Sequence, residues 1–144
     1  MKYISHSPEE TFSLAAEFSK KLIPGDIITL DGDLGAGKTA FTRGLSHGLS
    51  LTDIVVSPTF TIVNEYTKGD IPLFHFDVYR LESEDDMYDI GWEDYLSRNG
   101  ICVVEWSKIM PELFSSLPHY EVTINKNLDI SEDYREIFID KIGG

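Results

Sequence analysis

The sequence predicts a three-layer α/β fold with a mainly parallel sheet and an antiparallel hairpin contribution, and three observations carry this prediction. Residues 27–30 (IITL) form a short apolar run that precedes a glycine-rich loop and a helical pattern. Residues 101–104 (ICVV) are typical of a strand buried on both faces. Residues 59–77 are two extended segments with a turn at Lys68-Gly69-Asp70, as in a hairpin. Helical patterns between such strands indicate helices on both faces of a sheet.

The first expected element is a helix that begins at residue 8. Ser7 and Glu10 have the spacing of a capping box, and Pro8 stands at the first helical position. The positions that share one face of this helix are Thr11, Ala15, Phe18 and Leu22. The chain then turns at Pro24-Gly25-Asp26 into the expected strand 27–30.

The next element is a loop that limits the range of possible functions more than any other part of the chain. Residues 32–39 (GDLGAGKT) complete the pattern Gly-x-x-x-x-Gly-Lys-Ser/Thr of a phosphate-binding loop, between the expected strand and a helix. Its glycines let backbone N–H groups turn toward an anion at the positive end of that helix. Lys38 is expected to reach the β- and γ-phosphates, and Thr39 to ligate Mg²⁺. The nucleotide-binding residues expected here are Leu34, Gly35, Ala36, Gly37, Lys38 and Thr39.

The elements after the loop helix are shorter. Residues 54–56 and 59–66 are expected to be extended, with a break at Ser57-Pro58, and residues 73–76 to return as a strand that ends at Asp77. The acid-rich stretch 82–94 is expected to be a short solvated helix that ends near Gly91. After the strand that ends at Glu105, residues 121–124 and 135–140 alternate apolar and polar side chains.

Two carboxylates are candidates for the metal site. A phosphate-loop enzyme needs a hard anionic group opposite the loop hydroxyl, and open α/β sheets collect such groups where strands end. Glu105 and Asp77 both end expected strands, although either one could simply cap a turn. We favour Glu105 for the metal and Asp77 for positioning water or Mg²⁺, so Lys38, Asp77 and Glu105 are the expected catalytic residues.

Other side chains leave their interpretation open. Ser57, Thr59 and Thr61 could form a segment that senses the γ-phosphate, or an ordinary threonine-rich strand. His75 is expected to pack, and Trp106 to be either core or a contact surface for a partner. Three arginines could stabilise charge in catalysis or form surface ion pairs; these are Arg43, Arg80 and Arg98.

Composition excludes several classes of function. A formal net charge of −13 argues against direct tight binding to a nucleic-acid backbone and favours a protein partner. No apolar run approaches a membrane span, and the start of the chain lacks a signal-peptide pattern. The single Cys102 lies in an apolar run and cannot form an intrachain disulfide. We therefore expect a soluble cytoplasmic protein of one domain, residues 1–144.

Four blocks of sequence together resemble one family, the bacterial TsaE (YjeE) ATPases of tRNA threonylcarbamoyladenosine synthesis. These blocks are GDLGAGKT at 32–39, SPTFT at 57–61 running to NEY at 64–66, HFDVYRL at 75–81, and ICVVEW at 101–106. They cover most of the chain in the order expected of the family. The resemblance is therefore highly specific.

The resemblance implies a P-loop ATPase that binds ATP and Mg²⁺ and acts with two partner proteins, TsaB and TsaD, on the tRNA adenosine next to the anticodon. It implies contact with tRNA only indirectly, through that complex. By the same resemblance Thr39 and Glu105 are metal positions, and Asp77 is an acid of the nucleotide site. Ser7 and Thr11 match the helix that contacts the adenine side, and Arg135 resembles the family's Gly-Arg, with Tyr134 in place of the glycine.

Two other classes of function remain open from the residues alone. The same loop serves small-molecule kinases, although no clear acceptor site or arginine-rich lid follows it. It also serves non-hydrolytic modules, in which a bound nucleotide switches partner binding through residues 57–66. Guanine specificity is not expected, because residues 125–128 (NKNL) lack the Asp of the guanine-reading pattern.

Overall fold

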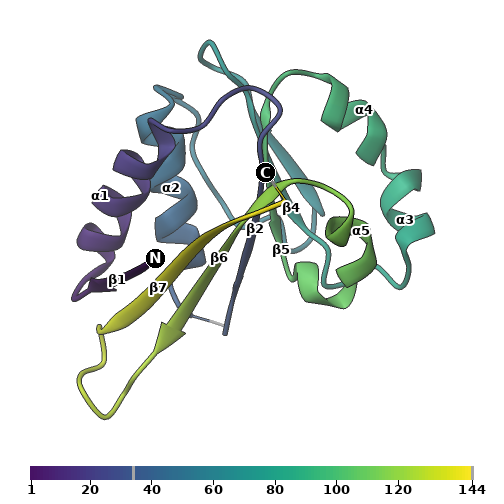
Figure 1. Ribbon diagram of the computed structural model, residues 1–144. Helices are drawn as coiled ribbons and strands as arrows, with labels where there is room; N and C mark the ends of the chain where they lie inside the picture. The colour runs from purple at the N-terminus through teal and green to yellow at the C-terminus, as the bar shows by residue number, and fades with distance from the viewer. Residues whose placement is uncertain (34, 144) are drawn as a thin grey trace.

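A computed structural model of the chain describes residues 1–33 and 35–143. Within them the strands and helices alternate along most of the chain (Figure 1). Their bounds are β1 (Lys2–Ser5), α1 (Pro8–Ser19), β2 (Ile27–Gly32), α2 (Lys38–Gly48), β3 (Val63–Tyr66), β4 (Leu73–Asp77), α3 (Glu84–Asp89), α4 (Trp92–Ser97), β5 (Ile101–Glu105), the 3₁₀ turn η1 (Ser107–Ile109), α5 (Pro111–Ser115), β6 (His119–Lys126) and β7 (Arg135–Ile142). No helix among these residues is both long enough and apolar enough to span a membrane.

The strands form one mixed sheet with a parallel core and antiparallel edges. Its order is β1-β7-β6-β2-β5-β4-β3 across the described residues. Strands β6, β2, β5 and β4 are parallel neighbours, whereas β1 with β7, β7 with β6, and β4 with β3 pair antiparallel. The expected hairpin is present in β3 and β4. The sheet is less parallel than predicted, because β1 and the β6–β7 hairpin make the other edge antiparallel as well.

Helices cover both faces of the sheet, with α1 and α2 on one side and α3, α4 and α5 on the other (Figure 1). Each face has its own apolar core. On β5, Ile101 and Val103 face α1 and α2, while Cys102 and Val104 face the opposite core. This alternation explains why the run in β5 is apolar throughout, since both of its faces are buried.

Helix α1 begins as its sequence predicts. The Ser7 hydroxyl accepts a hydrogen bond from the Glu10 N–H at 3.1 Å, and Pro8 follows at the first position. The Glu10 carboxylate accepts from the His6 N–H, whereas a full capping box would engage the N–H of Ser7. Helix α2 packs closely on α1 at Gly44, where the Cβ of any other residue would overlap the Phe12 carbonyl oxygen. This close approach requires glycine.

The segment after α2 differs from its prediction. Residues 54–56 are not a strand: the N–H and carbonyl of Val56 bond to the Tyr66 hydroxyl instead of to a neighbouring strand. Residues 58–62 turn because the Ile62 N–H donates to the Pro58 carbonyl at 2.8 Å, with Ile62 in the left-handed region (φ 70°). Strand β3 therefore begins only at residue 63.

Two further differences concern short elements. Strand β1 is absent from the sequence-based prediction, because it is half exposed and gains its partner only when β7 arrives from the far end of the chain. The stretch 82–94, expected to be one helix ending near Gly91, is followed by a second helix. Gly91 adopts φ 97° and separates α3 from α4, so the break itself is where the sequence indicates.

Candidate functional site

The carboxyl ends of β2, β5 and β4 meet at one edge of the sheet. The register pairs Asp77 of β4 with Glu105 of β5, and Leu30 of β2 with the same Glu105. Because side chains alternate along a strand, Glu105 shares the face of Ile101 and Val103, which is the face that α2 covers. The loop between β2 and α2 opens at this edge, so the fold brings the two candidate carboxylates to the start of α2.

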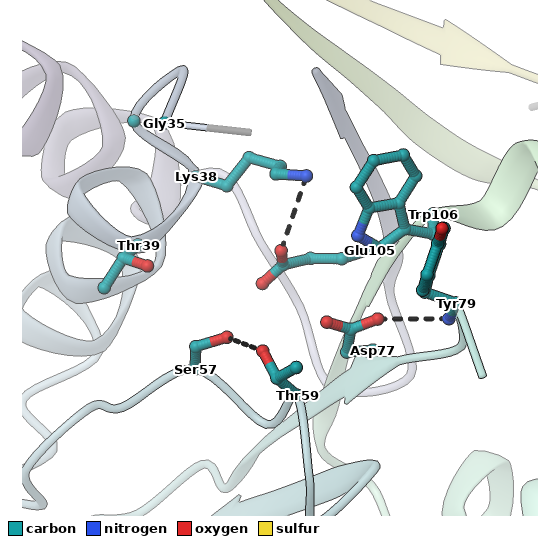
Figure 2. A pocket seen from close by; sticks show the side chains of 10 residues that line it. Gly35, Lys38, Thr39, Ser57, Thr59, Asp77, Tyr79, Glu105 and Trp106 are labelled. Carbon is teal, nitrogen blue, oxygen red and sulfur yellow. Dashed lines mark hydrogen bonds and ion pairs between the residues drawn. The ribbon is translucent and has the colours of Figure 1, made fainter. Parts of the chain in front are cut away.

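A cavity of about 530 Å³ lies between the start of α2 and these strand ends (Figure 2). The side chains of the expected site face it from α2, from the segment after α2, and from β4 and β5. Its lining consists of Gly35, Gly37, Lys38, Thr39, Ser57, Thr59, Asp77, Tyr79, Glu105 and Trp106. The structure therefore brings together the loop, both carboxylates and the hydroxyls of the 57–59 segment.

The loop itself has the backbone that its glycines permit. Gly37 has φ 107° immediately before α2, and Gly35 has φ 77°. Residues with a side chain rarely adopt this left-handed backbone region, so the turn depends on glycine at these positions. This turn aims the first N–H groups of α2 toward the cavity. Leu34, also expected in the nucleotide site, lies outside the described residues.

Lys38, the first residue of α2, extends over the cavity. Its ammonium donates to the Gly32 carbonyl at 3.0 Å and lies 3.8 Å from Glu105 Oε1. It also lies 4.1 Å from the centre of the Trp106 ring, a cation–π contact (Figure 2). The Lys38 and Glu105 side chains are only 8% and 6% exposed. The cation is thus held by a carbonyl, a carboxylate and an aromatic face, within reach of whatever enters the cavity.

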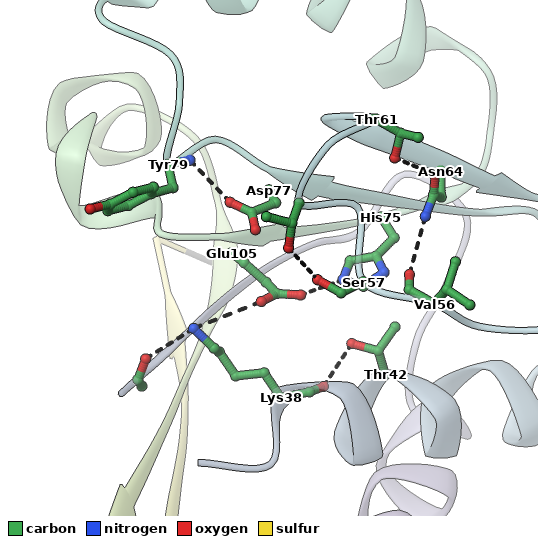
Figure 3. Close-up of polar contacts among 12 residues, drawn as sticks. Lys38, Thr42, Val56, Ser57, Thr61, Asn64, His75, Asp77, Tyr79 and Glu105 are labelled. Carbon is green, nitrogen blue, oxygen red and sulfur yellow. Dashed lines mark hydrogen bonds and ion pairs between the residues drawn. The ribbon is translucent and has the colours of Figure 1, made fainter. Parts of the chain in front are cut away.

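Glu105 uses its two oxygens differently. Oε1 faces the Lys38 ammonium, whereas Oε2 is hydrogen-bonded to His75 Nε2 at 2.5 Å (Figure 3). His75 lies two residues before Asp77 on β4 and is completely buried. The carboxylate therefore has one oxygen on the cavity side and one fixed from behind.

Asp77 is the second buried carboxylate. Its Oδ1 accepts a hydrogen bond from the Tyr79 N–H at 3.1 Å (Figure 2). Burial raises the pKa of Asp77, and the nearby charge of Glu105 acts in the same direction, while the Tyr79 N–H and the Lys38 ammonium oppose the shift. A carboxylate that holds a proton more readily than usual is suited to accept one from a bound water.

The opposite wall of the cavity carries hydroxyl groups. Thr39 follows Lys38 on the first turn of α2, and the hydroxyls of Ser57 and Thr59 are hydrogen-bonded to each other at 2.8 Å (Figure 2). Ser57 and Thr59 thus line the same cavity as the loop, which is the placement that the phosphate-sensing interpretation needs. Thr61 does not line the cavity; its hydroxyl donates to the Asn64 side chain at 2.6 Å.

The donor set of the cavity fits Mg²⁺. The Thr39 hydroxyl and the carboxylates of Glu105 and Asp77 are hard oxygen ligands on facing walls of one cavity. Mg²⁺ in nucleotide sites is bound by one or two carboxylates with phosphate oxygens and waters, not by a full protein cage. Thr39 and Glu105 could thus hold the ion while the loop holds the phosphates.

A smaller hollow of about 160 Å³ lies on the other side of the loop, between it and α1. Ser7, Thr11, Ala36 and Arg135, which are expected in the nucleotide site, line it together with other residues. The hydroxyls of Ser7 and Thr11 already have partners within the protein, because Ser7 caps α1 and Thr11 is hydrogen-bonded to Ser5. The hollow therefore offers shape and backbone groups more than free side-chain donors.

Arg135 braces the loop from this side. Its guanidinium donates to the carbonyls of Ala36 at 2.9 Å and Gly35 at 3.3 Å, and also to those of Glu132 and Tyr134. These are backbone groups of the loop and of the segment just before β7. The structure thus places Arg135 behind the loop, where it holds the backbone in shape.

The three arginines considered as charge stabilisers do not line the cavity. Arg98 forms an ion pair with Glu65 at 2.9 Å, Arg43 points to the Val55 carbonyl, and Arg80 lies near the ring of Phe60. For Arg98 the surface ion-pair interpretation is confirmed.

Sequence reasoning misses two contributors to the site. His75 is more than a packing residue, and its place two residues before Asp77, on the same face of β4, is a usable signal. Trp106 belongs to the cavity itself. It adopts φ 63° directly after β5, and this turn carries its ring over Lys38. No pattern in the sequence indicates that backbone conformation.

Comparisons with known proteins identify relatives of the chain by sequence and by fold. The family model described as "Threonylcarbamoyl adenosine biosynthesis protein TsaE" matches residues 5–137. Similar curated proteins carry the name tRNA threonylcarbamoyladenosine biosynthesis protein TsaE. The one from Bacillus subtilis is 44% identical over 148 aligned residues, covering 99% of this chain and 87% of that protein. The one from Treponema pallidum is 37% identical over 139 residues, covering 96% of this chain and 99% of that protein. The crystal structure of Bacillus subtilis YdiB superposes with a TM-score of 0.82 at 38% identity, covering 99% of this chain and 86% of that one.

Proposed function

The chain belongs to the TsaE family of threonylcarbamoyl adenosine biosynthesis proteins, and from this premise we propose that it is a Mg²⁺-dependent ATPase that serves the threonylcarbamoyladenosine modification of tRNA. The observation that carries the ATPase part is the single cavity in which Lys38, Thr39, Asp77 and Glu105 meet. We assign residues 1–144 to one domain of the P-loop NTPase fold, which the loop between β2 and α2 and the parallel strands beside it support.

Each residue of the cavity has its own role in this proposal. The N–H groups at the start of α2 bind the phosphates, and the Lys38 ammonium leaves Glu105 to neutralise the β- and γ-oxygens. Thr39 and Glu105 would hold Mg²⁺, which would neutralise charge that develops on the phosphates. Asp77 orients the attacking water and accepts its proton, a role that its raised pKa supports. The hydroxyls of Ser57 and Thr59 lie where they can detect the γ-phosphate.

The proposed partners are TsaB and TsaD, with tRNA reached only through that complex. The net charge of −13 makes the chain a poor ligand for a nucleic-acid backbone by itself. Large apolar side chains are exposed near the cavity, with Phe60 86% and Tyr79 63% accessible. Tyr79 lines the cavity, and Phe60 lies beside the 57–59 segment, so a partner that covers them could sense whether nucleotide is bound.

The experiment that tests the proposal compares ATP hydrolysis by the wild type, Lys38→Ala and Glu105→Ala, with and without TsaB and TsaD. Lys20→Ala, at an exposed position beside the end of α1, is the matched control. The proposal expects turnover that rises with the partners, falls in both site variants and is unchanged in the control. Modification of tRNA by the reconstituted mixture should follow the same order.

Two results would replace the proposal with another function. Tight ATP binding without hydrolysis under every condition would make the chain a nucleotide-gated binding module. Transfer of labelled phosphate to a metabolite, with water not the acceptor, would make it a kinase. Equal turnover with and without the partners would separate the ATPase from the modification of tRNA.

A further inference from the structure

A buried chain of hydrogen bonds runs from the cavity into the protein behind Glu105, and Figure 3 shows its first link, between Glu105 and His75. It starts at Glu105 Oε2, passes through both nitrogens of the His75 ring and the hydroxyl of Tyr66, and ends on the backbone of Val56. The site chemistry described above assigns no task to His75 or Tyr66. Their arrangement shows what they do for Glu105.

His75 is held in one orientation by its two polar neighbours. Its Nε2 lies 2.5 Å from Glu105 Oε2, and its Nδ1 lies 3.3 Å from the Tyr66 hydroxyl oxygen. The side chain has no exposed surface, and β4 carries it between β3 and β5 in the sheet. Rotating the ring would break both contacts and leave buried polar atoms without partners, which costs more than a typical hydrogen bond contributes.

Tyr66 in turn is held by the backbone. Its hydroxyl donates to the Val56 carbonyl at 2.9 Å and accepts from the Val56 N–H at 3.2 Å. The residue is 3% exposed, and burial raises the pKa of its phenol, so the hydroxyl keeps its proton and remains a donor. The far end of the hydrogen-bond chain is thus anchored just before the 57–59 hydroxyls.

The need for such an anchor follows from Lys38. In the structure Glu105 is held from two sides, by the Lys38 ammonium at Oε1 and by His75 at Oε2. When Lys38 turns to the phosphates, Oε1 loses that partner, and His75 remains to fix the carboxylate. A flexible glutamate that must bind a metal through one oxygen would otherwise lose rotamer freedom on each binding event.

We propose that His75, supported by Tyr66, is a positioning residue that holds Glu105 Oε2 and so presents Oε1 to the metal ion. This inference rests on the proposed function, because it takes Glu105 as the metal ligand. Partners behind a metal ligand that orient it in this way are worth about 10–100-fold in metal affinity. His75 itself is fully buried and does not line the cavity.

The test measures metal binding directly. Mn²⁺ replaces Mg²⁺ as an EPR-visible probe and is titrated into the full-length protein saturated with AMP-PNP. His75→Leu keeps an apolar side chain of similar size and should weaken Mn²⁺ binding about 10–100-fold. His75→Gln places an amide nitrogen near the position of Nε2 and should therefore keep most of the wild-type affinity for Mn²⁺. Affinity for AMP-PNP in EDTA, measured by calorimetry, should be unchanged in both variants.

A second pair of variants guards against a folding defect in His75→Leu. Tyr66→Phe removes only the hydroxyl behind His75 and should weaken Mn²⁺ binding in the same direction, but less than His75→Leu does. Tyr95→Phe is the matched control, because its hydroxyl bonds to Glu65 on the surface, away from the cavity. It should bind Mn²⁺ as the wild type does. Circular dichroism establishes that each variant is folded.

Several outcomes would overturn the inference. Wild-type Mn²⁺ affinity in His75→Leu, together with its loss in Glu105→Ala, would remove His75 from the site but leave the proposed function standing. Equal losses in His75→Leu and His75→Gln, or weaker AMP-PNP binding in EDTA, would reduce His75 to packing. Unchanged Mn²⁺ affinity in Glu105→Ala would instead remove the metal assignment on which the proposed function depends.

Discussion

Lys38 and Glu105 form a buried ion pair across the cavity, with Nζ 3.8 Å from Oε1 and both side chains less than a tenth exposed. The pair joins the residue that should bind phosphate to the residue that should bind metal. Each side chain of this pair therefore contacts a group that must be free for ligand binding: Lys38 for the phosphates and Glu105 for the metal. A ligand entering the cavity must separate them, and this competition has measurable consequences.

The first consequence concerns binding in the absence of metal. Glu105→Gln removes the charge that competes for Lys38 and that repels the phosphates, so ATP in EDTA should bind about tenfold tighter, or about 1.4 kcal/mol. The same variant should lose hydrolysis with Mg²⁺. Calorimetry in EDTA measures the affinity, with the exposed Glu112→Gln as control. Weaker binding than the wild type would show that Lys38 is not held back by Glu105.

Asp77→Asn should separate binding from chemistry. The amide can still accept the Tyr79 N–H but cannot take a proton from water, so hydrolysis should fall by about 10²–10⁴-fold. Affinity for ATP with Mg²⁺ should change far less. Single-turnover hydrolysis and equilibrium binding measure the two effects separately. A parallel loss of both would assign Asp77 to binding and leave the proton acceptor unidentified.

Arg135→Ala should weaken ATP binding although the guanidinium lies behind the loop. It removes the bonds to the Ala36 and Gly35 carbonyls that hold the loop backbone, and we expect a loss of about tenfold in affinity. Arg135→Lys should not restore it, because an ammonium cannot span both carbonyls as the planar fork does. Lys141→Ala, also on β7, is the control. Unimpaired binding in Arg135→Ala would mean that the loop holds its shape unaided.

The loop and both carboxylates can be predicted from the sequence because their chemistry is local. Gly37 and Lys38 are identified by a fixed spacing, and Asp77 and Glu105 by their position directly after apolar runs. The parallel pairing of the strands then brings these ends together without further information. The central part of the site is therefore accessible from the residues alone.

The remaining features depend on contacts between distant parts of the chain. β1 exists because β7 covers its edge, and residues 54–56 lack a strand partner because the Tyr66 side chain takes the Val56 backbone groups. The ring of Trp106 reaches Lys38 through a left-handed backbone turn that is uncommon for tryptophan. None of these features has a periodicity or a spacing that could be recognised before folding.

The pH dependence of stability should depend on Asp31, on the face of the sheet opposite the cavity. Burial raises the pKa of Asp31 above its ordinary 3.8, against the hydrogen bond from Ser107 and the charges of Lys108 and Lys38. The folded state thus binds the proton more tightly than the unfolded state. The free energy of unfolding therefore falls as pH rises from the ordinary pKa of Asp31 through its raised pKa in the folded state. Asp31→Asn should raise the Tm at pH 7, and the gain should disappear as pH falls toward 3.8. A gain that persists at low pH would exclude this cause.

The last prediction uses Trp106 as a reporter of the Lys38 ammonium. The cation lies 4.1 Å from the centre of the ring in the structure, and it should leave the ring when it binds phosphate. Tryptophan emission should therefore change on addition of ATP. Trp92 is 1% exposed in the opposite core and should be silent, so Trp92→Phe should keep the change and Trp106→Phe should abolish it. Lys38→Met should bind poorly, and at saturating ATP it should give a smaller change than the wild type. An undiminished change in Lys38→Met would mean that the ring detects the nucleotide itself and not the movement of the lysine.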